Sequence, residues 1–197
     1  MSEPSIPDWI NAGSAAIGAL AILIGLFGAN AKINENRRTA RQIRRSEVAE
    51  ELIALSHNVE DAFAHIRNPM VSIPKDRLSD KKYAYQQRYE RLASYNNLFK
   101  KLRDAQIRVR AVIGDREVDQ AVEVLFRTRA QLATAIEILA DYTDWEASEL
   151  DQMEKDHRKK LRSDLYGSFS RSDDLGSKIT EAVSVIENKL SPIARLE

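Results

Sequence analysis

Residues 9–45 read WINAGSAAIGALAILIGLFGANAKINENRRTARQIRR, an apolar run that passes directly into a basic one. Between Ala12 and Ala29 the only polar side chain is that of Ser14. A helix rises about 1.5 Å per residue, so about 20 apolar residues cross the roughly 30 Å hydrocarbon core of a bilayer. The sequence therefore predicts a transmembrane helix over residues 9–31, and the rest of the chain is interpreted from it.

The charges on the two sides of this run predict its orientation. Residues 1–8 contain Glu3 and Asp8 but no lysine or arginine, whereas the basic residues of 32–45 face Glu35 alone: Lys32, Arg37, Arg38, Arg41, Arg44 and Arg45. Basic residues next to a span stay on the cytoplasmic side. We expect residues 1–8 to lie outside, 32–45 to form a basic juxtamembrane segment, and 46–197 to form a cytoplasmic domain at a bacterial inner membrane.

Two other interpretations of the apolar run are disfavoured. A cleaved signal peptide could use Ala29-Asn30-Ala31 as its small-x-small site, but it would need a basic amino-terminal region, and this one is acidic. A core helix of a soluble protein would show one polar face, whereas this run is apolar on every face.

Small residues form one stripe along the predicted span, at alternating spacings of four and three: Ser14, Gly18, Ala21 and Gly25. Such stripes let two helix backbones approach closely in lipid, although glycine and alanine are also simply common in membrane helices. Self-association through this stripe is the functional interpretation.

Composition limits the remaining possibilities. The 197 residues suffice for the anchor and one domain, and the formal net charge of zero combines a positive collar with a negative remainder. No general nucleic-acid surface is expected from basic residues that would lie at lipid head groups. The chain has no cysteine, which excludes disulfides and thiolate sites, and no glycine-rich phosphate loop is present.

Residues 46–197 contain apolar residues at helical spacing in four segments. The first covers about 46–67 and stops before Pro69; the second begins near Ser79 and ends at Gly114. The third starts after a cap at Asp115 and bends or breaks near Asp144, and the last runs from about Asp173 to Pro192. These patterns predict an all-α fold, an antiparallel helical bundle or coiled-coil-like domain behind one transmembrane helix.

Candidate catalytic and metal-binding groups are few. His57, Asp61 and His65 lie at i, i+4 and i+8 on one helical face, where three ligands could hold a divalent metal, but that face is expected to be solvated. Glu154 and His157 form a single E-x-x-H unit, whereas di-iron bundles need two. The aromatic stripe Tyr85, Tyr89, Tyr95 and Phe99 is interpreted as core. We expect no cofactor and no catalytic set.

Residues 44–69, RRSEVAEELIALSHNVEDAFAHIRNP, resemble a motif RR-x-EVAEE…IR-x-P that follows the span in uncharacterised bacterial single-pass membrane proteins. Residues 164–192, DLYGSFSRSDDLGSKITEAVSVIENKLSP, resemble the tail of the same group. The resemblance implies a bacterial membrane origin and carries no assigned activity or site.

Three classes of function remain open. The favoured one is a non-catalytic, membrane-anchored helical module that binds a cytoplasmic protein or forms a homo-oligomer, with its arginine collar on anionic lipid head groups. The second is an oligomeric membrane effector that perturbs the bilayer. The third is a metal-dependent enzyme that uses His57 or His157.

Overall fold

A computed structural model describes the backbone of residues 6–145, 150–167 and 173–196, with side chains from Lys32 onward. Every regular element in these ranges is a helix, and none is a strand: α1 (Ile6–Ile66), η1 (Lys75–Arg77), α2 (Tyr83–Ser94), α3 (Asn96–Val112), α4 (Arg116–Asp141), η2 (Tyr142–Asp144), α5 (Gln152–Tyr166) and α6 (Asp174–Ala194). The predicted all-α fold and its bundle-like helix packing are confirmed. The chain divides into two units, Met1–Arg44 and Arg45–Glu197.

The first unit contains the amino-terminal part of α1. The apolar run of residues 9–31 has a helical backbone, but its side chains lie outside the described residues. Within the residues described with their side chains, no helix combines the length and apolarity that crossing a membrane requires.

The second unit is a helical bundle whose core starts close to Ser46. From there on, α1 buries its large apolar side chains at the spacings of four and three that the sequence shows: Val48, Leu52, Leu55, Val59, Phe63 and Ile66. This spacing keeps the apolar side chains on one face of the helix. All six residues belong to the core, as the helical spacing of the first predicted segment requires.

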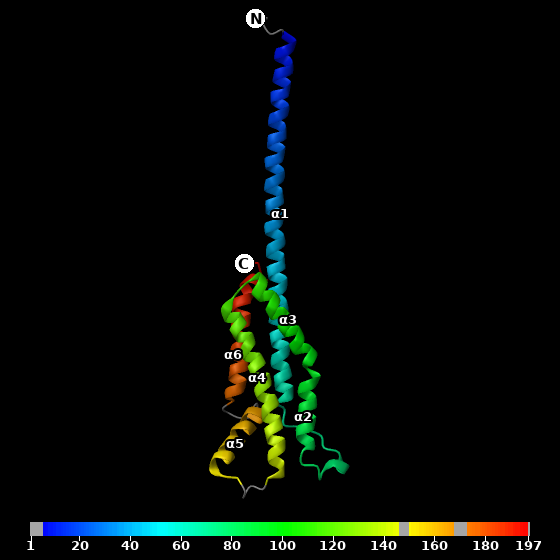
Figure 1. Ribbon diagram of the computed structural model, residues 1–197, viewed down its shortest axis with the longest axis vertical. Coiled ribbons are helices and arrows are strands. Elements are labelled where there is room, and N and C mark those ends of the chain that lie inside the picture. Colours follow the sequence, from blue (N-terminus) through cyan, green and yellow to red (C-terminus); the bar gives the residue numbers. More distant parts are fainter. Residues whose placement is uncertain (1–5, 146–149, 168–172, 197) are drawn as a thin grey trace. The chain divides into compact units, whose positions relative to one another are not determined.

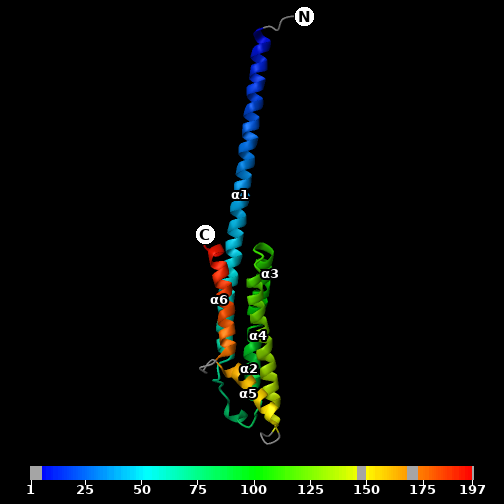
Figure 2. The same cartoon turned by 90° about the vertical axis from the view of Figure 1, so that its left-hand side faces the viewer.

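Helix α4 is the central element of this bundle and packs against α2, α3, α5 and α6. Both ribbon views place α4 and α6 side by side (Figures 1 and 2). Its buried face is mostly apolar and consists of Val118, Ala121, Val122, Leu125, Thr128, Leu132, Ala135, Ile136 and Leu139.

Helices α1 and α6 run antiparallel, and three contacts define their alignment. Ser46 Oγ donates to the carbonyl of Ala194 at 2.5 Å, and Thr180 Oγ1 donates to Glu60 Oε1 at 2.7 Å. Arg67 pairs with Asp173 at the other end. The number of residues between successive contacts is the same on both helices, so the alignment does not shift along the pair.

The predicted second helix is wrong in its start and its continuity. It begins at Tyr83 without a side-chain cap, and Ser79 lies in the preceding turn, where Asp80 Oδ1 accepts from the Lys82 amide at 3.0 Å. The helix also breaks at Tyr95. The hydroxyl of Ser94 donates to the carbonyl of Arg91 at 2.7 Å, a local bond that competes with helix continuation.

The third predicted helix is confirmed, including its break. Asp115 caps α4 by accepting from the amides of Glu117 and Val118, after a left-handed turn at Gly114 with φ of 76°. Helix α4 then ends at Asp141, and η2 separates it from α5. A glycine is required at position 114 because a positive φ strains any residue with a Cβ.

Two smaller predictions are wrong. Pro192 does not end the last helix, because α6 continues to Ala194. A proline in the final turn removes few backbone hydrogen bonds, so the helix tolerates it there. Tyr89 is 45% exposed and not part of the core. Arg88, one residue earlier, occupies the buried position instead.

Candidate functional site

The predicted lipid-contact residues form an exposed basic collar on α1: Arg37, Arg38, Arg41, Arg44 and Arg45. Within the part of the chain that the structure describes, these five arginines have no carboxylate partner. The only carboxylate in 32–45, that of Glu35, pairs instead with Lys32 Nζ at 3.2 Å. The collar therefore presents uncompensated positive charge, immediately before the first buried residue of the bundle, Ser46.

The predicted self-association stripe of Ser14, Gly18, Ala21 and Gly25 lies on α1. Its side chains fall outside the described residues, so the stripe remains a prediction.

Two of the three candidate metal ligands on α1, His57 and His65, contact other side chains. His57 Nε2 lies 3.3 Å from Glu187 Oε2, and His65 Nδ1 lies 2.9 Å from the hydroxyl of Tyr95. Asp61 is exposed between them. Among the described residues, no three histidine, cysteine, aspartate or glutamate side chains converge as metal ligands would.

Glu154 is engaged in helix capping. Its Oε2 accepts from the Asp151 amide at 2.8 Å, while Asp151 Oδ1 accepts from the Glu154 amide at 2.7 Å. This reciprocal pair is a capping box at the start of α5. His157 is exposed on the same helix.

A buried arginine centre, which sequence analysis did not predict, lies where α1 ends. The side chain of Arg67 is 3% exposed, and its Nη1 and Nη2 donate to Asp173 Oδ2 and Oδ1 at 2.8 and 2.5 Å. Its Nε donates to the carbonyl of Asp164 at 2.8 Å. The guanidinium thus ties the end of α1 to the end of α5 and the start of α6.

Asp173 has a second role as the cap of α6, because its side chain accepts from the Gly176 amide at 2.8 Å. The hydrogen bond from Arg67 holds the pKa of the Asp173 carboxyl below its usual range. The negative charge at the start of α6 also interacts favourably with the helix dipole. Asp173 therefore stays ionised at neutral pH and serves both partners.

Two glycines leave room for this pair. A Cβ at Gly176 would lie 2.1 Å from Asp173 Oδ2, and a Cβ at Gly167 would lie 2.8 Å from Arg67 Nη2. Both distances are well below van der Waals contact. Glycine is required at these positions by the close approach of the ion pair rather than by backbone conformation.

Two further arginines bind the chain that leaves α1. Arg88 donates to the carbonyls of Asn68 and Pro69 at 2.8 and 2.9 Å, and Arg91 donates to the carbonyl of Met70 at 2.8 Å. These bonds satisfy carbonyls beyond the helix end. Arg88 is almost fully buried, and this burial lowers the pKa of its guanidinium.

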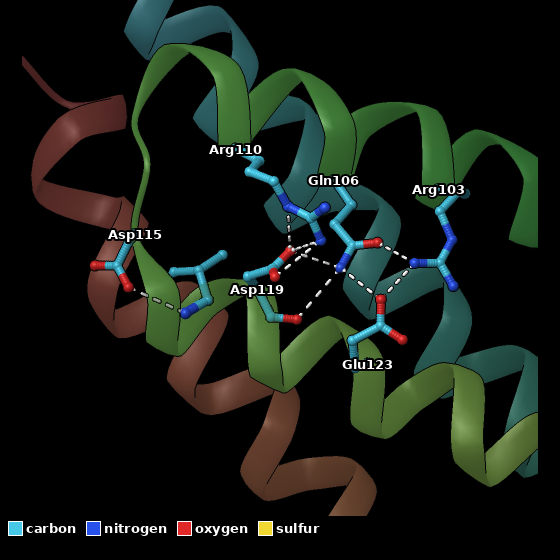
Figure 3. A network of polar contacts seen from close by, with 7 residues as sticks. Arg103, Gln106, Arg110, Asp115, Asp119 and Glu123 are labelled. Carbon is cyan, nitrogen blue, oxygen red and sulfur yellow. Dashed lines mark hydrogen bonds and ion pairs between the residues drawn. The ribbon is translucent and has the colours of Figure 1, made fainter.

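The α3–α4 hairpin carries a separate polar network (Figure 3). Gln106, which is 2% exposed, donates through Nε2 to Asp119 Oδ1 at 2.8 Å and to Glu123 Oε1 at 3.0 Å. Arg103 and Arg110 bind Glu123 and Asp119 from either side. The bond from Arg103 is the main cause that lowers the pKa of Glu123.

Neither the arginine centre nor this network leaves an open position for chemistry. Every nitrogen of the Arg67 guanidinium has an acceptor, and the donors of the network bind carboxylate and amide oxygens of the same hairpin. Both arrangements position helices. The residues of the arginine centre lie in two stretches quoted above, but nothing in the sequence pairs them: IRNP contains Arg67, and DLYGSFSRSDDLG contains Gly167, Asp173 and Gly176.

Comparisons with known proteins place the chain in no group: no protein-family model matches it, and no curated protein or solved structure matches it significantly.

Proposed function

We propose that this protein is a non-catalytic helical interaction module anchored in a bacterial inner membrane by a single span, with residues 1–8 outside and the bundle in the cytoplasm. Residues 9–31 would be the span, and the collar would lie on anionic head groups. The bundle would bind a cytoplasmic protein or a second copy of the chain.

The observation that carries this proposal is the change of environment along α1. The collar arginines are exposed and unpaired, whereas burial begins at Ser46 and the core begins at Val48. Arginines packed against identical arginines of a second helix would repel, and no acidic partner is at hand. Near an anionic surface, each would instead gain about 1 kcal/mol.

The bundle supports the proposal in a second way. Its apolar core is continuous from Val48 to Leu190, so the bundle can present its outer surface to a partner without unfolding. Of the titratable side chains singled out in the sequence, His57, His65 and Glu154 are engaged in pairing or capping, whereas Asp61 and His157 are exposed. A positioning and binding role fits these features better than catalysis.

The absence of native cysteine provides a direct test of topology. Single cysteines would be introduced by Ser5→Cys and by Ser177→Cys, an exposed position on α6, in the full chain expressed in bacteria. A membrane-impermeant maleimide should label the Ser5→Cys variant in intact cells, and the Ser177→Cys variant only after permeabilisation. The opposite labelling would overturn the orientation.

Release from the membrane provides the matching test of the anchor. The chain should stay in the membrane fraction after extraction at high pH, which removes peripheral proteins. A variant with Leu20→Arg, Leu23→Arg and Leu26→Arg should be released, because charges are costly in the bilayer centre. Release of the unmodified chain would rule out the anchor, whatever the labelling shows.

A further inference from the structure

A groove of about 500 Å³ lies between the start of α2, the η2 turn and α5. Its volume is within the range of about 300–1,000 Å³ that is usual for small-molecule sites. The described residues that line it include cationic and aromatic side chains but no carboxylate. All of them belong to the second unit.

Three cations line this groove: Lys81, Arg158 and Arg162. None of them has an ion pair within the described chain, whereas the neighbouring Lys82 binds Asp144 Oδ2 at 2.6 Å. Arg158 Nε is buried without a hydrogen-bond partner among these residues. Desolvating a guanidinium without full compensation is costly, and an anion bound to its other N–H groups would offset that cost.

The same groove has an aromatic wall. Tyr142 and Trp145 make a T-shaped contact with ring centroids 6.3 Å apart, and Trp145 is 50% exposed. The guanidinium of Arg158 lies over the Tyr142 ring, 5.9 Å from its centroid, so the half-exposed Trp145 is the ring that offers a surface for a planar ligand. Behind the wall, the guanidinium of Arg88 lies 4.6 Å from the ring centroid of Tyr166 and supports that ring from the protein interior.

Two other grooves of similar volume lack this combination. The groove between α4 and α6 contains Glu117 and Glu181 beside Lys178, and the groove between α2 and α4 contains Asp80 and Glu137 beside Lys82. In both, the carboxylates of the groove oppose its own cations. Among these three grooves, only the one at η2 and α5 offers unopposed positive charge next to stacking surfaces.

We infer that this groove binds a nucleoside phosphate. The phosphate groups would lie on Arg158, Arg162 and Lys81, because guanidinium N–H groups match phosphate oxygens in pairs. The base would stack on the Tyr142 and Trp145 wall, which accepts any base because every base has a π-face. The site is independent of the membrane anchor.

Isothermal titration calorimetry of the full chain in detergent tests this assignment, with ATP, adenosine and inorganic triphosphate as probes. ATP should bind most tightly, since it alone uses both halves of the groove. The double variant Arg158→Gln with Arg162→Gln should weaken ATP binding at least about tenfold, through the loss of charge-assisted bonds. The matched control, Lys155→Gln with Lys159→Gln, removes the same charge at the same spacing on α5 but outside the groove and should change affinity less than about twofold.

A separate variant tests the aromatic wall of the groove. Trp145→Ala should weaken ATP binding about tenfold and leave triphosphate binding unchanged. Should the arginine double variant fail to fold, Arg162→Gln alone, at an exposed position, replaces it. No binding of ATP at millimolar concentration, equal affinity for ATP and triphosphate, or tighter binding of a short single-stranded RNA would each overturn the assignment.

Discussion

Arg67 and Asp173, which lie 106 residues apart in the sequence, form a two-pronged ion pair in which both guanidinium Nη atoms donate to one carboxylate. The arginine directly follows Ile66, the last residue of α1, and the aspartate is the cap of α6. One contact thus joins the end of the first helix to the start of the last. Loss of either side chain should affect the whole bundle rather than one helix.

Replacing Asp173 by Asn should therefore destabilise the bundle strongly. The substitution leaves the buried Arg67 without its countercharge, and breaking a buried pair in this way costs about 3 kcal/mol or more. Thermal unfolding followed by circular dichroism should show a clear drop in midpoint. Asp174→Asn removes the same charge one residue later, at an exposed position with no side-chain contact to the described residues, and should have little effect. Equal midpoints for the two variants would contradict a stabilising role for the pair.

The same pair predicts the response to acid. Because the pKa of Asp173 is lower in the folded state than its unfolded value of about 3.9, its contribution is present above that value and is lost as pH falls through the folded pKa. The temperature at which half of the native chain is unfolded should decrease as the pH is lowered below about 4. Part of that fall should be missing in Asp173→Asn, which has nothing to protonate there, and should remain in Asp174→Asn.

The effect of Gly176→Ala on the free energy of unfolding should depend on whether Asp173 is present. In the native chain, Gly176→Ala should destabilise, because the new Cβ would meet the carboxylate that Arg67 holds in place. In an Asp173→Ala background this obstacle is gone. The same change should then be neutral or stabilising by up to about 1 kcal/mol, since alanine favours a helix more than glycine does. A double-mutant cycle measured by urea unfolding gives the interaction energy, and simple additivity would show that the close approach is unimportant.

In the α3–α4 hairpin, Gln106→Ala should cost about 1–3 kcal/mol. It removes a buried amide that binds both Asp119 and Glu123, and those carboxylates lose a donor. Gln120→Ala, at an α4 position with no such network, is the comparison. The free energy of unfolding from urea titrations should separate the two variants, and equal losses would count against the network shown in Figure 3.

The collar predicts salt-dependent binding to lipid. A fragment of residues 32–197 should bind liposomes that contain anionic lipid at low ionic strength and dissociate as salt rises. Changing the five collar arginines to Gln should abolish co-sedimentation. Changing the same number of exposed lysines on the bundle should not: Lys100, Lys101, Lys155, Lys159 and Lys160. Binding that ignores salt and lipid charge would leave the collar as an orientation signal only.

Local patterns were sufficient to predict most of the helices. Apolar spacing identified the buried face of α1 and α4, and Asp115 was recognised as a cap from its position after Gly114. The break at Tyr95 escaped prediction because the apolar spacing continues through it, to Leu92 before and Phe99 after. The spacing of apolar side chains shows which face of a helix is buried. It does not show a break in the helix, such as that at Tyr95, when the buried face continues on both sides of the break.

The arginine centre could not be predicted for a different reason. A charged residue in an amphipathic pattern is assigned to solvent by default, and Arg67 and Arg88 are both buried. Their burial depends on carbonyls and a carboxylate brought from distant parts of the chain. The groove at η2 and α5 likewise combines residues from three separate segments. Such sites arise from tertiary packing, and a single sequence carries little sign of them.

The constant alignment of residues 46–66 with α6 restricts how this pair of helices can move. A slide of one helical turn, about 5.4 Å, would break the contacts of Ser46 with Ala194, Glu60 with Thr180 and Arg67 with Asp173 all at once. A small tilt or rotation can keep them. A displacement along the helix axis that enters the bundle at Ser46 should thus cost more contacts than a rotation does.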